Sequence, residues 1–254
     1  MNGDAARRVV WITGAGKGIG RALAHRYAAD GWTVAASART EGDLLALQDD
    51  CASGTIRAFP LDITDSVAVD AAVTRIEEEL GPIDLAILNA GNHRPLNAND
   101  FDIDVFRSLV ETNLMGTVNC LAPLVPRLIE RESGHIAVVA SLAGYRGLPT
   151  AAAYGATKAG VINMCESLRP DLAQYNVRLS LINPGFVRTP LTDQNDFPMP
   201  FLISAEKAAE YVMQGLRRNA FETAFPWRFA VMMKALKILP DRLFFALTRR
   251  MIGK

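Results

Sequence analysis

The chain has no excess of charge of either sign. Its 254 residues contain 27 Lys and Arg and 27 Asp and Glu, so the formal net charge is zero. Proteins that hold nucleic acids depend on a basic surface that attracts phosphates. The balance of charge therefore argues against a nucleic-acid partner.

Cysteine is scarce, and long hydrophobic runs are absent. The three cysteines, Cys51, Cys120 and Cys165, are widely spaced and form neither a C-x-x-C pair nor a metal-ligand pattern. We expect buried thiols in a reducing compartment and no bound metal. The amino terminus has no signal-peptide core, and no eighteen uncharged apolar residues occur together. These absences predict a cytoplasmic protein without a membrane span.

Hydrophobic residues make up 50% of the chain, which is enough for the core of one domain. Strands are predicted at 8–13, 32–38, 55–61, 83–88, 135–140 and 177–182, with an edge strand at 222–227. Helices are predicted at 21–30, 41–51, 66–80, 106–130, 152–175 and 205–219. This alternation predicts an α/β fold over residues 1–227, a doubly wound parallel sheet with helices on both faces.

A glycine-rich turn follows the first predicted strand. It reads G-A-G-K-G-I-G from Gly14 to Gly20 and opens the first predicted helix. Glycines at 14, 18 and 20 would let the backbone approach a pyrophosphate, which the positive amino end of the helix would stabilise. The spacing T-G-x-x-x-G-x-G differs from the G-x-G-x-x-G dinucleotide fingerprint. The alternative is that these glycines only make a tight turn.

The end of the second predicted strand carries a cation in place of an acid. NAD-binding folds commonly put a carboxylate here for the ribose hydroxyls, whereas a 2′-phosphate needs a positive charge. Ser37, Ala38 and Arg39 occupy this place, and Lys17 adds a second cation on the same side. We therefore expect NADP(H) rather than NAD(H), although both side chains are also typical of a solvated surface.

Three further turns at strand ends suit a flat, polar cofactor. Asp62, after the third strand, is placed to reach an adenine amino group or to cap the next helix. The corner N-A-G at 89–91 lets the chain pass close beneath the cofactor, or is only a turn. In N-P-G-F-V-R-T-P, proline and glycine fix a turn, after which the Val187 backbone and the Thr189 hydroxyl can bind a carboxamide.

The stretch from Ser141 to Lys158 can assemble a proton donor for a carbonyl. Ser141 follows the buried strand H-I-A-V-V-A, at the edge where open parallel sheets place their ligands. The alanine-rich segment after it predicts a helix with Tyr154 and Lys158 one turn apart on one face. An ammonium near a phenol favours the phenolate, so Lys158 would lower the pKa of Tyr154 toward working pH. The alternative is a core helix with a chance tyrosine and lysine.

Asn113 is a polar residue in an apolar stretch of the long helix predicted at 106–130. A buried asparagine needs hydrogen-bond partners, so it either ties the helix to a strand or holds a water in the site. His93 lies in a polar loop near the proposed pocket. We do not expect it to act as a base, because Tyr154 already fills that role.

The carboxyl-terminal part of the chain is apolar and basic. The irregular loop at 191–203 is rich in large apolar residues, Phe197, Met199, Phe201 and Leu202. Such a loop suits a lid over a hydrophobic substrate, or simple packing. Residues 228–254 hold seven Lys or Arg and one Asp, with apolar residues at helical spacing. Basic amphipathic helices of this kind lie on anionic membranes, close a pocket, or dock on an acidic surface or a sister subunit.

Six features occur in one order at one set of spacings: T-G-A-G-K-G-I-G, N-A-G, Asn113, Ser141, Y-G-A-T-K and N-P-G-F-V-R-T-P. Together they resemble the short-chain dehydrogenase/reductase (SDR) family, of the NADP-preferring type, over roughly residues 8–226. The resemblance implies a Rossmann-type fold, a nicotinamide cofactor and a catalytic tetrad of Asn113, Ser141, Tyr154 and Lys158. It also implies a homodimer or homotetramer built through the two long helices.

By this resemblance, Ser141 orients the substrate carbonyl and Tyr154 gives it a proton as hydride leaves the nicotinamide. Lys158 binds the ribose hydroxyls, and Asn113 holds a water of the proton relay. The cofactor-binding residues expected from the turns and the resemblance together are Gly14, Gly16, Lys17, Gly18, Ile19, Gly20, Arg39, Asp62, Ile63, Asn89, Ala90, Gly91, Tyr154, Lys158, Pro184, Gly185, Val187 and Thr189.

The sequence thus predicts an NADP(H)-dependent oxidoreductase that interconverts a lipophilic ketone or aldehyde and its alcohol. The alternatives are a nicotinamide-binding redox sensor without turnover, and a membrane-surface interaction protein that uses residues 228–254. The intact tetrad argues against a sensor, since a sensor has no need of Tyr154. We expect a cytoplasmic homo-oligomer, with the basic tail as its candidate for peripheral membrane contact.

Overall fold

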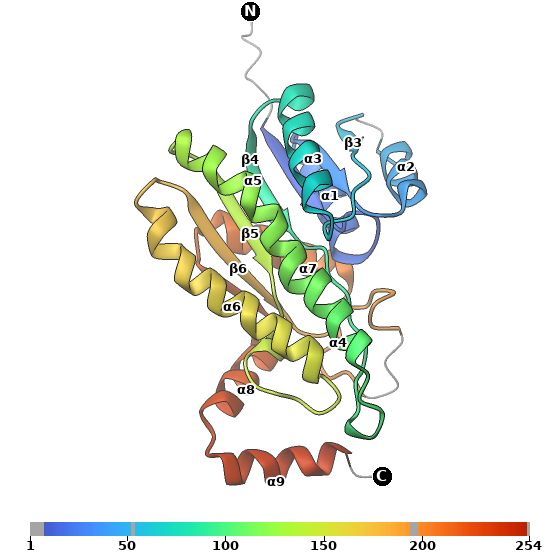
Figure 1. The fold of residues 1–254 in the computed structure, drawn as a ribbon, viewed down its shortest axis with the longest axis vertical. Helices are drawn as coiled ribbons and strands as arrows, with labels where there is room; N and C mark the ends of the chain where they lie inside the picture. Colours follow the sequence, from blue (N-terminus) through green and yellow to red (C-terminus); the bar gives the residue numbers. More distant parts are fainter. Residues whose placement is uncertain (1–7, 52–53, 194–197, 253–254) are drawn as a thin grey trace, which may run out of the picture.

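The computed structural model of the chain describes residues 8–51, 54–193 and 198–252 (Figure 1). Seven strands form one sheet in the order β3-β2-β1-β4-β5-β6-β7, and every pairing is parallel. The strands are β1 (Val9–Thr13), β2 (Thr33–Ser37), β3 (Ile56–Ala58), β4 (Ile83–Leu88), β5 (His135–Val139), β6 (Arg178–Pro184) and β7 (Glu222–Phe225). The predicted doubly wound sheet is confirmed, and its order reverses between β1 and β4, where open α/β sheets bind ligands.

Helices cover both faces of the sheet (Figure 1). One face packs against α1 (Gly18–Ala29), α2 (Glu41–Asp49) and α7 (Ala205–Arg217). The other face packs against α3 (Ser66–Leu80), α5 (Gly116–Glu130) and α6 (Ala152–Ala173). Alternation along each strand serves both cores, so Val9 and Trp11 belong to one and Val10 and Ile12 to the other. A sheet covered on both faces needs apolar residues at successive positions, which is why its strands are visible in the sequence.

The helix predicted at 106–130 is three segments. It begins earlier, as α4 (Ile103–Leu109), passes through the π-helical turn η2 (Val110–Met115), and continues as α5. The two short 3₁₀ turns are η1 (Ala98–Asp100) and η3 (Leu142–Gly144). A π turn holds one residue more than an α turn and is frequent at functional sites. Helical periodicity continues through such a turn, so the sequence did not indicate it.

The basic tail forms two helices, α8 (Trp227–Ile238) and α9 (Asp241–Ile252). Figure 1 shows both near the end of the sheet where the strands finish, with α9 lying across the bottom of the molecule. Phe229, Ala230 and Met233 of α8 are buried against Leu142, so this helix docks on the body of the same chain. Of the alternatives considered for the tail, docking on the rest of the chain is thus seen for α8, through apolar contacts.

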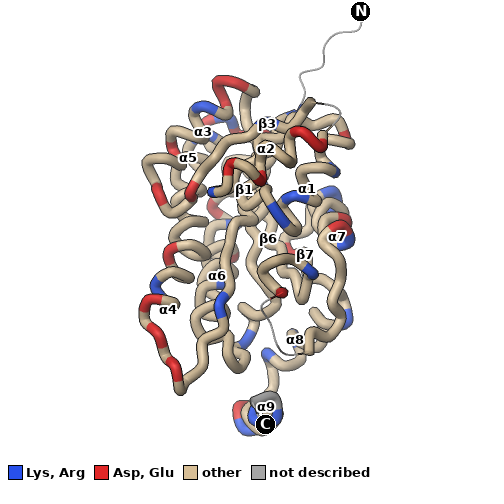
Figure 2. Tube along the Cα trace, turned by 90° about the vertical axis from the view of Figure 1, so that its right-hand side faces the viewer, with Lys and Arg blue, Asp and Glu red and all other residues tan. Residues whose placement is uncertain are grey.

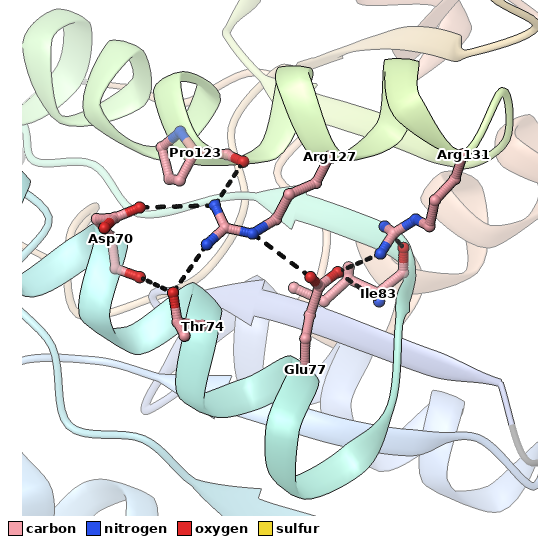
Figure 3. Close-up of polar contacts among 7 residues, drawn as sticks. All are labelled: Asp70, Thr74, Glu77, Ile83, Pro123, Arg127 and Arg131. Atoms are coloured by element: carbon pink, nitrogen blue, oxygen red, sulfur yellow. Dashed lines mark hydrogen bonds and ion pairs between the residues drawn. The ribbon is translucent and has the colours of Figure 1, made fainter.

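Two arginines of α5 hold α3 in place (Figure 3). Arg131 pairs with Glu77 at 2.6 Å, and its other guanidinium nitrogen donates to the Ile83 carbonyl at 3.3 Å. Arg127 donates to the Thr74 hydroxyl at 2.8 Å and to the Pro123 carbonyl at 2.9 Å. These bonds fix α5, and with it the π turn η2, against the start of β4.

None of the three cysteines forms a disulfide, and not all of them are buried. Cys120 and Cys165 lie in the core, and burial raises the pKa of each thiol to about 12. Cys51 is partly exposed, because it follows the end of α2 at the surface, so the expectation of burial is wrong for this residue. In the described residues, no cluster of three or more His, Cys, Asp or Glu side chains could hold a metal ion. Among these same ranges, every helix is too short or too polar to span a membrane.

Candidate active site

Three of the four predicted catalytic residues, Ser141, Tyr154 and Lys158, meet at the carboxyl ends of β4, β5 and β6, whereas Asn113 does not line the cavity there. A cavity of about 120 Å³ lies there. The predicted residues that line it are Ile19, Asn89, Gly91, Ser141, Tyr154, Lys158, Pro184, Gly185, Val187 and Thr189. The lining residues that sequence analysis missed are Val139, Ala140, Leu191 and Thr192. The fold thus brings the glycine-rich turn, the N-A-G corner, the serine loop and the turn after β6 to one place.

Ser141 follows β5 directly and is almost fully buried. Its hydroxyl oxygen accepts the backbone N–H of Ala143 at 3.1 Å, which caps the short turn η3. Its O–H donates to the carbonyl of Pro184 at 3.4 Å. The bond from Ala143 fixes the loop after β5, and the bond to Pro184 joins this loop to β6. Together they hold the Ser141 hydroxyl in the cavity.

Tyr154 lies in the first turn of α6 and lines the cavity together with Ser141. Burial raises the pKa of the phenol, and the nearby Ser141 side chain opposes this with a smaller lowering of that pKa. The ring of His93 meets the Tyr154 ring edge to face, with centroids 4.8 Å apart. The loop that carries His93 therefore packs directly on the candidate proton donor.

Lys158 lies one helical turn after Tyr154 and lines the same cavity. Its Nζ donates to the carbonyl of Val139 at 2.9 Å and lies 5.8 Å from the centroid of the Tyr154 ring. Burial lowers the pKa of this ammonium to about 8. The expectation that Lys158 lowers the pKa of Tyr154 is wrong for this arrangement, because desolvation of the phenol is the dominant effect.

Asn113 is fully buried in the π turn η2. Its Oδ1 accepts the N–H of Asn92 at 2.7 Å, and its Nδ2 donates to the Asn92 carbonyl at 2.8 Å. The Nδ2 also donates to the Thr157 hydroxyl at 3.2 Å. Of the two roles considered for this side chain, these contacts match a tie, which joins η2 to the turn after β4 and to α6.

The glycine-rich turn has no room for side chains. A Cβ at Gly20 would lie 2.2 Å from the Gly14 carbonyl oxygen and 2.7 Å from Nδ2 of Asn89. A Cβ at Gly14, whose φ is 66°, would lie 2.9 Å from Cα of Ala90. Backbone therefore packs on backbone at the amino end of α1. Such a cradle fits the pyrophosphate of a dinucleotide, which needs close backbone approach and helix N–H groups.

Thr13 and Asn89 connect the glycine-rich turn to the N-A-G corner. The Thr13 hydroxyl oxygen accepts the N–H groups of Asn89 at 3.0 Å and Ala90 at 3.1 Å. Nδ2 of Asn89 donates in return to the carbonyls of Thr13 at 3.0 Å and Gly14 at 3.3 Å. Sequence analysis missed Thr13, although a buried hydroxyl at the end of a strand is a signal that could have identified it.

The two predicted cations differ in what surrounds them. Lys17 pairs with Asp43 of α2 at 3.1 Å. Asp43 was not anticipated, and it lies so close to the turn that a Cβ at Gly16 would meet its Cβ at 2.9 Å. Arg39 is exposed and forms no ion pair within the described parts of the chain. Arg39 is therefore the more available of the two for a phosphate.

Asp62 and Ile63 lie beyond the end of β3 and do not line the cavity. Oδ1 of Asp62 accepts the N–H and the O–H of Thr64, at 3.0 and 2.9 Å. Asp65, and not Asp62, caps the amino end of α3, so Asp62 does not have the capping role that we considered for it. Ile63 is buried, and its carbonyl accepts from the side chain of Asn119 at 2.9 Å.

The turn after β6 closes the cavity beside α1. Its Thr192 hydroxyl donates to the carbonyls of Val187 and Thr189, at 2.8 and 2.9 Å, and accepts the Thr189 N–H at 3.0 Å. The methyl of Thr189 lies against Gly18, where a Cβ would meet it at 2.8 Å. Part of the predicted lid, including Phe197, lies outside the described residues.

A wider cleft, of about 840 Å³, opens at the opposite edge of the sheet, where the strands begin. Its side chains are engaged with their surroundings: Asp84 accepts the Val9 N–H at 2.7 Å, and Arg8 stacks 4.2 Å from the centroid of Trp32. It contains none of the predicted catalytic or cofactor-binding residues. The smaller cavity is therefore the candidate active site.

Comparison with known proteins agrees with this geometry. The model of the short chain dehydrogenase family matches residues 8–197. An uncharacterized oxidoreductase of Myxococcus xanthus is 39% identical over 250 residues, which cover 98% of this chain and 99% of that protein. Another, from Staphylococcus haemolyticus, is 31% identical over 213 residues, covering 84% of this chain and 92% of its own.

Two solved structures show the same likeness. A short-chain dehydrogenase from Streptomyces avermitilis has a TM-score of 0.81 at 25% identity and covers 91% of each chain. A short-chain dehydrogenase from Sphingobium yanoikuyae in complex with NADPH has a TM-score of 0.80 at 25% identity, covering 90% of this chain and 92% of its own. With the family model matching well over half of its residues, the chain belongs to the short-chain dehydrogenase/reductase family of nicotinamide-dependent oxidoreductases.

Proposed function

We propose that the protein is an NADP(H)-dependent oxidoreductase that interconverts a lipophilic ketone or aldehyde and its alcohol. The observation that carries the proposal is that Ser141, Tyr154 and Lys158 line one cavity at the carboxyl ends of the strands. The glycine cradle opens toward the same edge of the sheet. Carbonyl reduction needs a proton donor and a bound dinucleotide at one place, and both can be held at this edge of the sheet.

The protein's own part in the reaction is to orient the carbonyl and to move a proton. A bound nicotinamide would supply or accept the hydride. Ser141 would hold the substrate oxygen by a hydrogen bond, and Tyr154 would donate its phenolic proton to that oxygen. The raised pKa keeps Tyr154 protonated at neutral pH, which is the form that reduction needs. Lys158, with a pKa of about 8, stays mostly charged at neutral pH and would bind ribose hydroxyls.

The preference for NADP(H) rests on Arg39. The strand β2 ends without an acid that would repel a 2′-phosphate, and Arg39 follows it after one intervening residue, Ala38. Lys17 is neutralised by Asp43, so it contributes less to this preference than the sequence suggested. The likeness to a Sphingobium dehydrogenase in complex with NADPH supports the same choice.

Replacing Arg39 by alanine is expected to raise the Kd for NADPH by about 10-fold to 100-fold and to leave the Kd for NADH nearly unchanged. A charge-assisted hydrogen bond to a phosphate contributes about 1.5–3 kcal/mol, and NADH lacks that phosphate. Titration of protein fluorescence with each cofactor measures both constants. Lys17→Ala is the matched control, and its effect should be smaller because Asp43 already holds the ammonium. Equal weakening of both cofactors by Arg39→Ala would contradict the assignment.

A lipophilic substrate is supported by the apolar side chains beside the cavity. Phe186 stacks on Phe229 with ring centroids 5.4 Å apart, and Phe201 lies 6.2 Å from Phe229. The buried side chains of Leu142 and Met233 extend the same cluster. These side chains pack behind the cavity wall, while the apolar residues Ile19, Val139, Val187 and Leu191 line it and would bind hydrocarbon by removing it from water.

We further propose a catalytic domain at residues 1–227, a homodimer or homotetramer built through α5 and α6, and a cytoplasmic location. The outer face of α6 carries small side chains such as Ala152, Ala156 and Ala159, which permit close helix contact. The tail at 228–254 is the candidate for contact with a membrane surface.

A panel of ketones, aldehydes and alcohols tests the proposed reaction, with NADPH and NADH followed in parallel at the nicotinamide absorbance. Turnover of apolar carbonyls with NADPH is expected. Consumption restricted to NADH would contradict the cofactor choice, and turnover restricted to small polar carbonyls would contradict the substrate class.

A further inference from the structure

Helices α8 and α9 expose large apolar side chains that nothing in the described part of the chain covers. The exposed fractions are 66% for Trp227, 59% for Val231, 83% for Ile238, 56% for Leu243, 57% for Phe245 and 45% for Leu247. Scattered apolar residues are normal on a protein surface, but six on two consecutive helices form a patch of the kind that marks an interaction site.

The helical repeat places the exposed apolar residues of α8 opposite its buried ones. Trp227 and Val231 are one turn apart, and Ile238 follows two turns later, while Phe229 and Met233 are buried against the body. In α9, Phe244 and Thr248 are buried, with Leu243 and Leu247 exposed on one side of them and Phe245 on the other. α8 therefore has an apolar face directed outward, whereas the exposed apolar residues of α9 flank its docked face.

The same two helices carry cations that lack carboxylate partners. Arg228, Lys237, Arg242, Arg249 and Arg250 are exposed and form no ion pair among the described residues. Asp241, the one acid of the tail, pairs with Arg146 at 2.6 Å, and Lys234 pairs with Glu222 at 2.6 Å. Figure 2 shows the basic α9 below the rest of the molecule. We refer to the six exposed apolar residues and these five cations as the C-terminal surface.

One residue of the loop after Ser141 fixes the joint between α8 and α9. Arg146 donates to the carbonyls of Leu236, Lys237 and Leu239, at 2.9, 3.1 and 2.5 Å. Its guanidinium also lies 4.0 Å from the centroid of the Phe244 ring. The C-terminal surface is therefore held in a defined position relative to the catalytic loop.

The inner face of α8 forms a wall next to the cavity. The ring of Phe229 packs so closely on Gly185, which lines the cavity, that a Cβ at Gly185 would lie 2.5 Å from it. A helix with its side chains is about 10 Å across, so the exposed row of α8 lies roughly that distance from this wall.

We propose that the C-terminal surface docks on an anionic membrane. Tryptophan, leucine and phenylalanine side chains enter the interfacial region of a bilayer, and arginines bind lipid phosphates. A second copy of this chain would bring the same positive charges against each other in a two-fold interface. A soluble acidic partner would match the charge but gains little from a convex apolar surface. An anionic membrane can bind both the positive charges and the exposed apolar side chains.

Docking would also hold the mouth of the active site at the bilayer. The catalytic cavity and α9 lie at the same end of the sheet (Figure 1). A lipophilic carbonyl dissolved in the membrane would then reach the site without crossing water. This second step rests on the proposed function, whereas docking itself does not.

The experiment uses the full chain and vesicles of two compositions, phosphatidylcholine with phosphatidylglycerol and phosphatidylcholine alone. Flotation is expected to recover the protein with the anionic vesicles only, and high salt should release it. The triple variant Arg242→Glu, Arg249→Glu, Arg250→Glu should bind at least about tenfold more weakly, since each cation near an anionic surface contributes to the affinity. Leu243→Ser with Leu247→Ser should also weaken binding.

A matched control carries the same change of charge elsewhere. The variant Arg57→Glu, Arg75→Glu, Arg107→Glu alters exposed residues of β3, α3 and α4 and should bind vesicles like the unmodified protein. Circular dichroism confirms that each variant is folded. Equal binding by both triple variants, or no binding to anionic vesicles by the unmodified protein, overturns the proposal. Loss of a stable dimer in the α9 variant, without vesicle binding, would assign the surface to a second copy and overturn it as well.

Activity assays with two ketones distinguish a failure of the docking proposal from a failure of the proposed catalytic function. A water-soluble ketone should be reduced equally by the unmodified protein and the α9 triple variant. A long-chain ketone presented in anionic vesicles should be reduced faster by the unmodified protein. If neither ketone is reduced although vesicles bind, the proposed function fails and docking stands. If both are reduced without vesicle binding, docking fails and the function stands.

Discussion

Replacing Tyr154 by phenylalanine is expected to lower kcat for carbonyl reduction by about 10²-fold to 10⁴-fold, the usual contribution of a positioned proton donor. The substitution removes only the phenolic hydroxyl and leaves the ring packed against His93. Substrate oxygen would then gain negative charge with no proton donor in reach. The Kd for NADPH should change little, because the phenyl ring keeps its place in the cavity wall.

The measurement is single-turnover reduction of a ketone, together with titration of NADPH. Tyr145→Phe is the matched control, because Tyr145 is another partly buried tyrosine, and its hydroxyl bonds to Glu222 outside the cavity lining. It should retain kcat within about tenfold, since removal of one hydrogen bond costs about 1 kcal/mol. Undiminished turnover by Tyr154→Phe, or equal losses in the two variants, would remove Tyr154 from the mechanism.

Replacing Gly20 by alanine is expected to weaken NADPH binding by more than about 100-fold and to lower the free energy of unfolding by about 1–3 kcal/mol. The added Cβ would lie 2.2 Å from the Gly14 carbonyl oxygen and 2.7 Å from Nδ2 of Asn89. Neither neighbouring atom can move away easily, because the first belongs to the backbone of Gly14 and the second donates a hydrogen bond to the Thr13 carbonyl. The turn would have to open, and the cradle would lose its shape.

Gly42→Ala is the control for this prediction. Gly42 lies in α2, and a Cβ there would meet nothing within 4 Å. Alanine favours a helix over glycine by about 1 kcal/mol, so this variant should be slightly more stable and bind NADPH normally. Urea denaturation and cofactor titration measure both effects. Normal cofactor binding by Gly20→Ala would show that the turn does not hold the pyrophosphate.

The sheet and most of its helices were predictable because each strand is apolar on both faces and each helix is bounded by recognisable residues. The helix predicted at 66–80 has these same ends as α3, with Asp65 accepting two backbone N–H groups at its start and Gly81 following its end. The Ser204 cap of α7 is likewise confirmed, by a 3.2 Å bond from the Lys207 N–H. Such signals are local in the chain.

What could not be predicted depends on contacts distant in the chain. The pairing of Lys17 with Asp43 joins a turn to a helix 26 positions later, and either residue alone reads as solvated surface. The raised pKa of Tyr154 depends on burial by several elements, whereas the sequence indicated only the neighbouring Lys158. The placement of the two tail helices depends on Arg146, which lies in a distant part of the chain and cannot be recognised from the sequence of the tail.

The π turn at Val110–Met115 implies that this enzyme can lose a residue there and still fold. Deleting one residue from the turn would convert it to ordinary α-helix and leave α4 and α5 facing the same neighbours. The shortened protein should therefore be at least as compact, yet the Asn113 amide would rotate away from Asn92 and Thr157. We therefore expect a homologous chain with a gap at this position to keep the architecture but to lose the tie that Asn113 makes between the turn after β4 and α6.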